Sequence, residues 1–358
     1  MADLEHEVLA RLERQRKLRP RFRDNTITMA HGAGGKATHS LVAGLFADAF
    51  ANDALNELAD AARLDVGGTE IAFTTDAFVV KPLRFPGGSI GELAVNGTVN
   101  DLAVSGARPL AIAAAFVIEE GLNADELRSE VRAMADAAQR AGVAIVAGDT
   151  KVVERGKADG MYIATTGVGI VDPRASLSAA SIRVGDRLLI SGAIGDHGTA
   201  IMLARGELDL DADIESDTAS VWPAAAALID AAGDKVRVMR DPTRGGVATV
   251  LNELAGDAEV GVVVDEAAIP IHPPVQGACE ILGIDPMYVA NEGKLIAVVA
   301  ADVAEDALDA LRGVPGCHEA VLAGRVAQDP AGMVLVNTAF GGTRIMDMLV
   351  GDPLPRIC

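Results

Sequence analysis

The sequence predicts an α/β protein built from layers of helices and sheets, and three observations lead to this fold class. Short β-rich runs alternate with helical patches along the chain, which is the pattern of mixed α/β or α+β layers rather than of a helical bundle. The length of 358 residues suggests two domains, because domains usually contain about 150 residues. The alternation stops at Asp172-Pro173 and then starts again. We therefore predict two α/β halves joined near residue 175.

Each half is expected to contribute its own strands and helices, as judged from period-2 and period-3.6 patterns of apolar residues. In the first half, we expect strands at Ile71–Thr75, Leu110–Ile118, Val143–Ala147 and Met161–Val171, with helices at Ile90–Ser105 and Ala124–Ala141. In the second half, we expect strands at Arg187–Ser191, Val260–Val264, Leu295–Val299 and Ala320–Val326, with helices at Thr199–Arg205, Thr218–Ala232 and Val303–Leu311. The predicted boundaries are a charged N-terminal extension (1–25), two domains (26–172 and 173–340) and a C-terminal tail (341–358).

Composition and charge exclude several classes of protein. The net charge of −20 argues against nucleic acid, because phosphate binding needs clustered Lys and Arg. The longest apolar run, Leu110–Ile118, is far shorter than the ~20 residues of a membrane span, and the first 20 residues lack the apolar segment of a signal peptide. The three cysteines form no CxxC pair and suggest no disulfide framework. We expect a cytoplasmic protein without a membrane partner.

The chain ends in a thiol at the free C-terminus, Asp352-Pro-Leu-Pro-Arg-Ile-Cys358. Pro353 and Pro355 lack backbone donors and favour an extended backbone. The eight residues from Gly351 can span roughly 25 Å, at about 3.3 Å per residue. One interpretation is a swinging arm that carries a sulfur into a pocket elsewhere. The other is a frayed terminus with an incidental cysteine.

Five loops at the ends of predicted strands and helices are rich in residues that bind nucleotides and metals. The first, His31–Lys36, places the flexible Gly34 and Gly35 beside the cation Lys36, which suits phosphate. It fails the Walker pattern, because Ala37 stands where Ser or Thr should follow the lysine. By itself, this loop could equally be a simple turn.

The other four loops carry charged or amide side chains: Asp76, Asn100-Asp101, Asp149 with Lys151, and Arg240 with Arg244. A single carboxylate at such a place more often caps a helix or forms a turn. Together they indicate more, because Mg²⁺ takes one or two carboxylates plus substrate phosphates, and Arg and Lys bind phosphate oxygens. The sequence therefore predicts an ATP and Mg²⁺ site outside the Walker and Rossmann plans.

These motifs together resemble the HypE family of [NiFe]-hydrogenase maturation carbamoyl dehydratases, in the superfamily named for aminoimidazole ribonucleotide synthase. The match runs from about Thr26 to Cys358. The internal loops are specific to the superfamily, whereas the Pro-Arg-Ile-Cys end is specific to the family. The matching segments are His31–Lys36, Thr75-Asp76, Val99–Ala103, Ala147–Lys151, Arg240–Thr249, Asn291–Lys294 and Pro355–Cys358.

The resemblance implies an aminoimidazole ribonucleotide synthase-like fold and a homodimer in which first-domain strands of two subunits form a barrel. ATP and Mg²⁺ would lie in a cleft lined by first-domain carboxylates. A partner carbamoyltransferase, HypF, would load a carbamoyl group onto Cys358. The enzyme would then use ATP to dehydrate this S-carboxamide to S-cyanide, and the cyano group would pass to an iron carried by a HypC–HypD complex.

The resemblance also implies roles for individual residues. Lys151 and Glu292 would remove the two N–H protons, and Asn100 would position the carboxamide. An alternative for Lys151 is neutralisation of phosphate. Mg²⁺ would be held by Asp76, Asp101 and Asp149. The residues expected to bind ATP are Gly34, Gly35, Lys36, Asp76, Asp101, Asp149, Arg240 and Arg244, the two arginines as candidates for contact with phosphate or with the tail.

Three alternative functions stay open at the level of sequence. Selenophosphate synthetase would carry Cys or selenocysteine beside the glycine loop, and this loop has none. Thiamine monophosphate kinase shares the Asp-rich cleft but needs no terminal thiol. A non-enzymatic dimeric scaffold is disfavoured, because all five loops keep charged or glycine residues together. Cys279 and Cys317 are expected to be buried apolar fillers.

Overall fold

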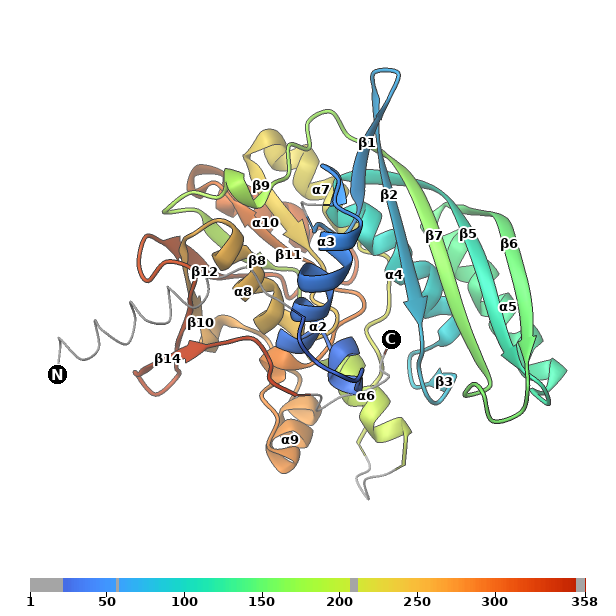
Figure 1. The fold of residues 1–358 in the computed structure, drawn as a ribbon. Coiled ribbons are helices and arrows are strands. Elements are labelled where there is room, and N and C mark those ends of the chain that lie inside the picture. Colours follow the sequence, from blue (N-terminus) through green and yellow to red (C-terminus); the bar gives the residue numbers. More distant parts are fainter. Residues whose placement is uncertain (1–21, 56–57, 207–211, 352–357) are drawn as a thin grey trace.

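The computed structural model describes residues 22–55, 58–206, 212–351 and 358, and within them the chain forms two large sheets (Figure 1). The first sheet has five strands in the order β1-β2-β7-β5-β6. The second has seven strands in the order β14-β13-β10-β12-β8-β11-β9. The predicted α/β class is confirmed. Most of the predicted charged extension, residues 1–25, lies outside the described residues.

The first sheet consists of β1 (Ala62–Val66), β2 (Thr69–Phe78), β5 (Ala107–Glu119), β6 (Ala144–Val153) and β7 (Met161–Val171). Neighbouring strands are antiparallel except for the parallel pair β5 and β6. Its helices are α4 (Ile90–Val104) and α5 (Ala124–Ala141). Helix α5 begins where the Asn123 side chain accepts from the Asp125 N–H, and it ends at Gly142, whose φ of 69° suits glycine. A short hairpin, β3 (Arg84–Phe85) and β4 (Gly88–Ser89), precedes α4.

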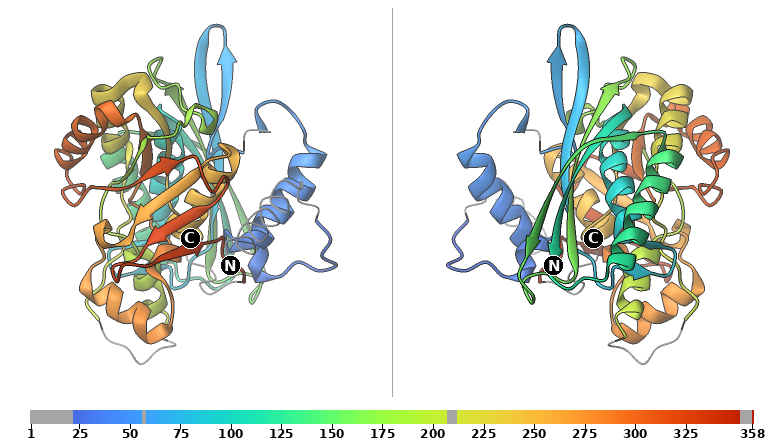
Figure 2. Two further views of the ribbon diagram at one scale, coloured as in Figure 1. Left: turned by 90° about the vertical axis from the view of Figure 1, so that its left-hand side faces the viewer. Right: turned by 90° about the vertical axis from the view of Figure 1, so that its right-hand side faces the viewer.

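Helices cover one face of this sheet and leave the other open. Along β2, Ala72, Thr74 and Phe78 are buried toward the helices, whereas the alternate residue Phe73 is 45% exposed. Ile170 of β7 is likewise 36% exposed. Figure 2 shows α4 and α5 on one side of the sheet and the segment with α2 (Lys36–Leu41) and α3 (Ala47–Ala49) projecting on the other. Apolar side chains are therefore exposed on the open face.

Strand β6 continues beyond the predicted strand Val143–Ala147 and includes Gly148–Lys151, which we had expected to form a loop. Asp149 pairs with Ala115 of β5, and Lys151 pairs with Val117. Pairing with β5 thus extends the strand through polar residues. Because β6 lies at the edge of the sheet, almost all of its side chains are exposed, including Val146 and Val152.

The second sheet consists of β8 (Arg187–Ile190), β9 (Val236–Arg240), β10 (Gly261–Asp265), β11 (Ile296–Val299), β12 (Val321–Ala327), β13 (Val334–Asn337) and β14 (Thr343–Met346). Helix α8 (Gly246–Asp257) packs on one face, and α7 (Trp222–Ala232) and α10 (Ala304–Arg312) pack on the other. The sheet therefore extends into the segment that the sequence analysis assigned to the tail, because β14 pairs with β13.

A shared core joins the two halves. Helices α6 (Asp196–Ala204) and α9 (Pro273–Leu282) come from the second half but pack in one apolar cluster with Phe78 and Ile90 of the first. Cys279 lies in this cluster, and Cys317 is buried beside α7 and α10. In the described part of the chain, no helix is both long and apolar enough to cross a membrane.

Candidate active site

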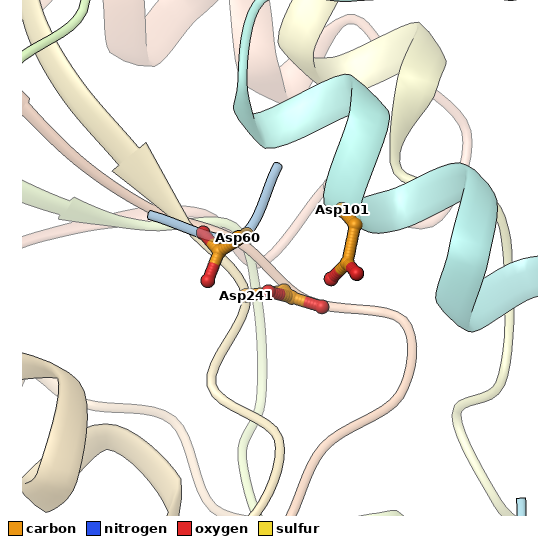
Figure 3. A group of neighbouring side chains, drawn as sticks. All are labelled: Asp60, Asp101 and Asp241. Carbon is orange, nitrogen blue, oxygen red and sulfur yellow. The ribbon is translucent and has the colours of Figure 1, made fainter. Parts of the chain in front are cut away.

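Three aspartates meet where the two halves join. Asp60 lies two residues before β1, Asp101 lies on α4, and Asp241 follows the last residue of β9. One carboxylate oxygen from each lies within 4.8 Å of the other two, and Figure 3 shows the side chains pointing toward one another. Asp101 also accepts a hydrogen bond from Thr74 Oγ1 at 2.7 Å. The sequence analysis found Asp101 but missed Asp60 and Asp241.

The electrostatics of this cluster favour a cation. Burial, and then the nearby Asp60, raise the pKa of Asp241 to about 8. Burial and the charges of Asp241, Asp76 and Asp60 raise the pKa of Asp101 well above its usual range. Carboxylates held together out of water resist ionisation unless a positive charge joins them. Oxygen donors of this kind are the ligands that Mg²⁺ prefers, so the cluster fits a divalent cation.

Asp76 belongs to the surroundings of this cluster. It lies on the face of β2 that carries the buried Thr74, and its charge acts on both Asp101 and Asp241. Burial raises the pKa of Asp76, whereas the charge of Arg244 lowers it. The structure therefore places two of the three predicted metal ligands, Asp76 and Asp101, at one site.

Arg240 is already paired within the protein. Its guanidinium lies 3.4 Å from Asp60 Oδ1 and donates to Glu253 Oε2 at 3.0 Å. Burial lowers the pKa of Arg240, but the charges of Asp60 and Glu253 more than offset this and raise it overall. Arg240 therefore orients Asp60 at the cluster. The sequence predicts instead that Arg240 contacts phosphate or the tail.

The C-terminal residue reaches the same place. Cys358 lies between the two sheets (Figure 1), and its terminal carbonyl oxygen accepts a hydrogen bond from the Val79 N–H at 2.9 Å. Burial, with the charges of Glu292, Asp76 and Asp241 adding to it, raises the pKa of the Cys358 thiol to about 12. Arg244 opposes this shift, and the charge of Cys358 is in turn the main cause of the raised pKa of Arg244.

Glu292 is fully buried near this thiol. Its Oε1 atom has no hydrogen-bond partner among the described residues, and its N–H donates to Asp217 Oδ1 at 3.0 Å. Burial, followed by the charges of Asp241, Asp76 and Asp217, raises its pKa well above the usual range, with Arg244 opposing. An unpaired buried carboxyl group is destabilising by about 1–3 kcal/mol or more. Such a group with a perturbed pKa is typical of a functional site.

Asn100 holds the chain around Glu292. Its Nδ2 donates to the backbone oxygens of Ala219 and Glu292 at 3.0 and 3.1 Å, and its Oδ1 accepts from the Val221 N–H at 2.8 Å. Both amide hydrogens are thus occupied by the protein. Asn100 therefore positions the backbone of Glu292, and its contact with a carboxamide stays a prediction. Val221, whose N–H donates to Asn100, is the residue directly before α7. This helix begins at Trp222, whereas the sequence predicts that it begins at Thr218.

The glycine loop contacts protein groups at several points. Lys36 Nζ lies 2.6 Å from Asp347 Oδ2. The Lys36 N–H donates to the Leu349 oxygen at 3.0 Å, and the Gly34 N–H donates to Thr38 Oγ1 at 2.9 Å. The Lys36 charge and the backbone N–H groups of Gly34 and Lys36, in the loop predicted to bind phosphate, therefore bind other groups of the same chain.

Asp149 and Lys151 do not reach the cluster within one chain. They form an ion pair with each other at 2.5 Å on the exposed edge strand β6, and this contact lowers the pKa of Asp149. The pairing Asp149–Ala115–Ala164–Ala77 places Asp149 three strands from β2, or about 14 Å at ~4.8 Å per strand. It also places Asp149 on the open face of the sheet, opposite to Asp76. Within one chain, Asp149 therefore lies apart from the cluster of Asp60, Asp101 and Asp241.

The fold, the aspartate cluster and the docked terminal cysteine define a class of protein. Residues 58–171 match the family model described as AIR synthase related protein, N-terminal domain, and residues 183–337 match its C-terminal domain. Within this class, the chain belongs to the carbamoyl dehydratase HypE family. It is 49% identical over 344 residues to carbamoyl dehydratase HypE of Bradyrhizobium diazoefficiens, covering 96% of this chain and 99% of the relative. It is 44% identical to the Escherichia coli protein of that name, covering 93% and 100%.

Solved structures agree with this family assignment. A crystal structure of a HypE–HypF complex contains a chain 46% identical, with a TM-score of 0.82 and coverage of 87% of this chain and 100% of that one. A crystal structure of HypE in complex with ATP is also 46% identical, with a TM-score of 0.78 and coverage of 93% and 100%. A thiamine monophosphate kinase from Aquifex aeolicus has a TM-score of 0.60 at 17% identity, with coverage of 85% and 96%, and so shares the fold alone.

The cluster predicts a pH-dependent response to Mg²⁺. Because the folded chain raises the pKa of Asp241 from 3.8 to about 8, the folded state holds a proton that the unfolded state has lost. Without a cation, this contribution to the unfolding free energy should therefore decrease as pH rises from about 4 to 8. Mg²⁺ should restore it, by about 3 kcal/mol at 100 times its dissociation constant. Thermal melting in EDTA and in Mg²⁺ measures both effects.

Asp241→Asn is the matched variant, because it removes the charge and keeps the size. It should melt higher than the native chain in EDTA at alkaline pH, since repulsion is relieved, and should lose most of the response to Mg²⁺. A native chain that does not respond to Mg²⁺ at alkaline pH would exclude the cluster as a cation site.

Proposed function

We propose that this chain dehydrates an S-carboxamide on Cys358 to S-cyanide, with consumption of ATP in the presence of Mg²⁺, as a source of the cyanide ligand of the [NiFe]-hydrogenase iron. One observation carries the proposal: the terminal thiol lies beside Glu292, Arg244 and the aspartate cluster. The atom that would carry the substrate is thus within reach of a candidate base and of a site that fits a cation. The family name carbamoyl dehydratase and a relative solved with ATP support the same reaction.

The chemistry explains why ATP is needed. The carboxamide oxygen is a poor leaving group, so direct loss of water would be slow. Attack of this oxygen on the γ-phosphorus releases ADP and forms an imidate phosphate. Loss of phosphate then completes the C≡N bond, and both N–H protons must leave during the sequence. The overall change is S-carboxamide plus ATP to S-cyanide, ADP, phosphate and a proton.

Glu292 is the proposed base for one of these protons. Its buried Oε1 atom has no partner among the described residues, so it can accept a hydrogen bond from the carboxamide N–H group. A raised pKa makes its carboxylate a stronger base once it is ionised. Arg244 favours the ionised form, and a cation held by Asp60, Asp101 and Asp241 would do the same. When bound, the cation would neutralise part of the negative charge on the phosphoryl group during its transfer.

The docked site favours the loaded arm over the free thiol. A thiol whose pKa is about 12 is neutral at physiological pH, and only the thiolate is an effective nucleophile. The docked thiol is therefore a poor nucleophile, and loading is proposed to take place after the arm leaves this position. The proposed donor is the carbamoyltransferase HypF, which a related HypE chain binds in a solved complex. The proposed cyanide acceptor is a HypC–HypD complex that carries the iron, which the family resemblance implies.

A second copy of the chain is proposed to cover the open face of the first sheet. Apolar side chains such as Phe73 and Ile170 are exposed there, and no strand of the described residues pairs with the outer edge of β6. Asp149 and Lys151 lie on this same open face, so in a symmetric dimer they would meet the partner rather than their own site. We infer that Lys151 acts across the interface of a homodimer whose first-domain strands form a barrel, and that Asp149 accompanies it.

Intact mass tests the reaction directly. The native chain, loaded with one carbamoyl group by the carbamoyltransferase, should lose one water mass when ATP and Mg²⁺ are added. Cys358→Ala should keep its melting temperature and ATP binding but should acquire no carbamoyl group. Carbamoyl found instead on Cys279 or Cys317 would contradict the proposal, and so would a loaded native chain whose mass ATP leaves unchanged.

In the same assay, Glu292→Gln keeps the size of the side chain and removes the base. It should be loaded normally and then lose water about 10²- to 10⁴-fold more slowly, which is the usual contribution of a general base. A near-native rate in this variant would exclude Glu292 from proton removal.

Mixed dimers test whether Lys151 acts across the interface. A dimer of one Lys151→Ala chain and one Cys358→Ala chain, isolated with two affinity tags, has one complete site if Lys151 serves the partner. It should therefore show about half the native rate per dimer, although each variant alone is nearly inactive. A mixed dimer no faster than the Lys151→Ala homodimer would mean that Lys151 serves its own chain or another function.

A further inference from the structure

The glycine loop contacts the stretch of chain from which the tail emerges. We call Met346–Leu349 the tail base, since it begins with the last residue of β14 and precedes the tail. The Lys36 N–H donates to the Leu349 oxygen at 3.0 Å, and Lys36 Nζ pairs with Asp347 at 2.6 Å. The loop thus binds the tail base through backbone and side chain.

Packing explains why two of the loop residues are glycines. A Cβ atom on Gly35 would lie 2.5 Å from the Leu349 oxygen, although its φ of −106° is open to any residue. A Cβ atom on Gly34 would lie 2.4 Å from the Arg244 oxygen, and the φ of Gly34, +77°, also favours glycine. The loop therefore fits between the tail base and the Arg244 backbone, with contacts too close for any side chain.

Other groups hold the tail base from the side of the second sheet. Tyr288 Oη donates to the Asp347 oxygen at 2.8 Å. Asn252 Nδ2 donates to the Met346 oxygen at 3.0 Å, and Thr249 Oγ1 donates to the Gly34 oxygen at 3.0 Å. Both Asn252 and Thr249 lie on α8, so one helix fixes the loop and the tail base together.

We propose that the Gly34-Gly35-Lys36 loop is the pivot of the swinging arm, with Gly35 as its positioning residue. This inference rests on the proposed function. The loop fixes the tail base, so the part of the chain after Leu349 carries Cys358 between its own site and the carbamoyltransferase. A fixed starting point keeps the effective concentration of the loaded sulfur at the site high. The loop also contacts the Arg244 backbone, and the charge of Arg244 interacts with the Cys358 thiol at the end of the arm.

The two kinds of contact at the pivot contribute differently. The side chains of Lys36 and Asp347 are 48% and 46% exposed. Exposed ion pairs of this kind usually contribute less than about 1 kcal/mol. The close backbone contact between Gly35 and Leu349 is the more specific one, because a single added methyl group must displace the tail base. Gly35→Ala is therefore the sharpest substitution.

The test compares Gly35→Ala with Gly32→Ala, a matched control in the same loop, where an added Cβ atom meets nothing within 4 Å. In Gly35→Ala, ATP-dependent loss of water from the loaded chain should slow roughly 10- to 100-fold, as expected when a reacting group is misplaced by about 1 Å. Nucleotide affinity measured by calorimetry and loading by the carbamoyltransferase should stay native. Gly32→Ala should match the native chain in all three measurements.

Two results would overturn the pivot. One is a native rate of dehydration in Gly35→Ala. The other is a loss of nucleotide affinity that accounts for the slower rate, because that result indicates a loop that binds phosphate. A native loaded chain that ATP cannot dehydrate contradicts the proposed function itself, so the two failures are distinguishable.

A charge exchange tests the pivot independently of Gly35. Lys36→Glu should slow dehydration several-fold, and Lys36→Glu combined with Asp347→Lys should restore it, since the pair is reformed in reverse. A lysine that neutralises phosphate would give the opposite result, because the double variant would still carry a negative charge at position 36. Failure of the double variant to recover would therefore exclude the pair from the pivot.

Discussion

Negative charge buried at the junction of the two sheets is the constraint on which the site depends. Asp60, Asp101 and Asp241 come from three separate parts of the chain, and burial raises the pKa of each. Two polar contacts help to hold these carboxyl groups close together. Asp60 forms an ion pair with Arg240, and Thr74 donates a hydrogen bond to Asp101. A cation bound by the three aspartates would relieve the repulsion among their negative charges.

The same charge determines how the terminal cysteine can be used. Beside Glu292 and Asp76 a thiolate is unfavourable, whereas a neutral S-carboxamide carries no such penalty. The site therefore suits a neutral, loaded sulfur better than a thiolate. The proposed pivot at Gly35 would set where the arm starts, and the Val79 N–H donates a hydrogen bond to the terminal oxygen of Cys358.

The limits of prediction from sequence follow from particular residues. Asp101 and Arg244 were found because polar residues interrupt apolar or glycine-rich segments, and the tail because its thiol follows two prolines. Asp241 lies in the predicted phosphate-binding loop that contains Arg240 and Arg244, but it is not among the predicted metal ligands. The sequence around Asp60 contains no motif that indicates a metal ligand, since only tertiary packing brings Asp60 to the cluster. Asp149 looked like a metal ligand, yet pairing with β5 places it on an edge strand. Lys36 looked like a phosphate ligand, and its pairing with Asp347 depends on a contact between residues 311 positions apart.

The central claim is that Cys358, itself half-buried, rests beside the buried carboxylates, and the pH dependence of its alkylation tests this most directly. Iodoacetamide reacts with thiolates, so the rate of labelling of the C-terminal peptide, followed by mass spectrometry, reports the pKa of this thiol. The account predicts slow labelling that is still increasing above pH 10, in line with a pKa of about 12, and rapid labelling of the unfolded chain. A titration in the folded protein near the ordinary value of about 8.5 would show that the thiol lies in solvent and would contradict the account.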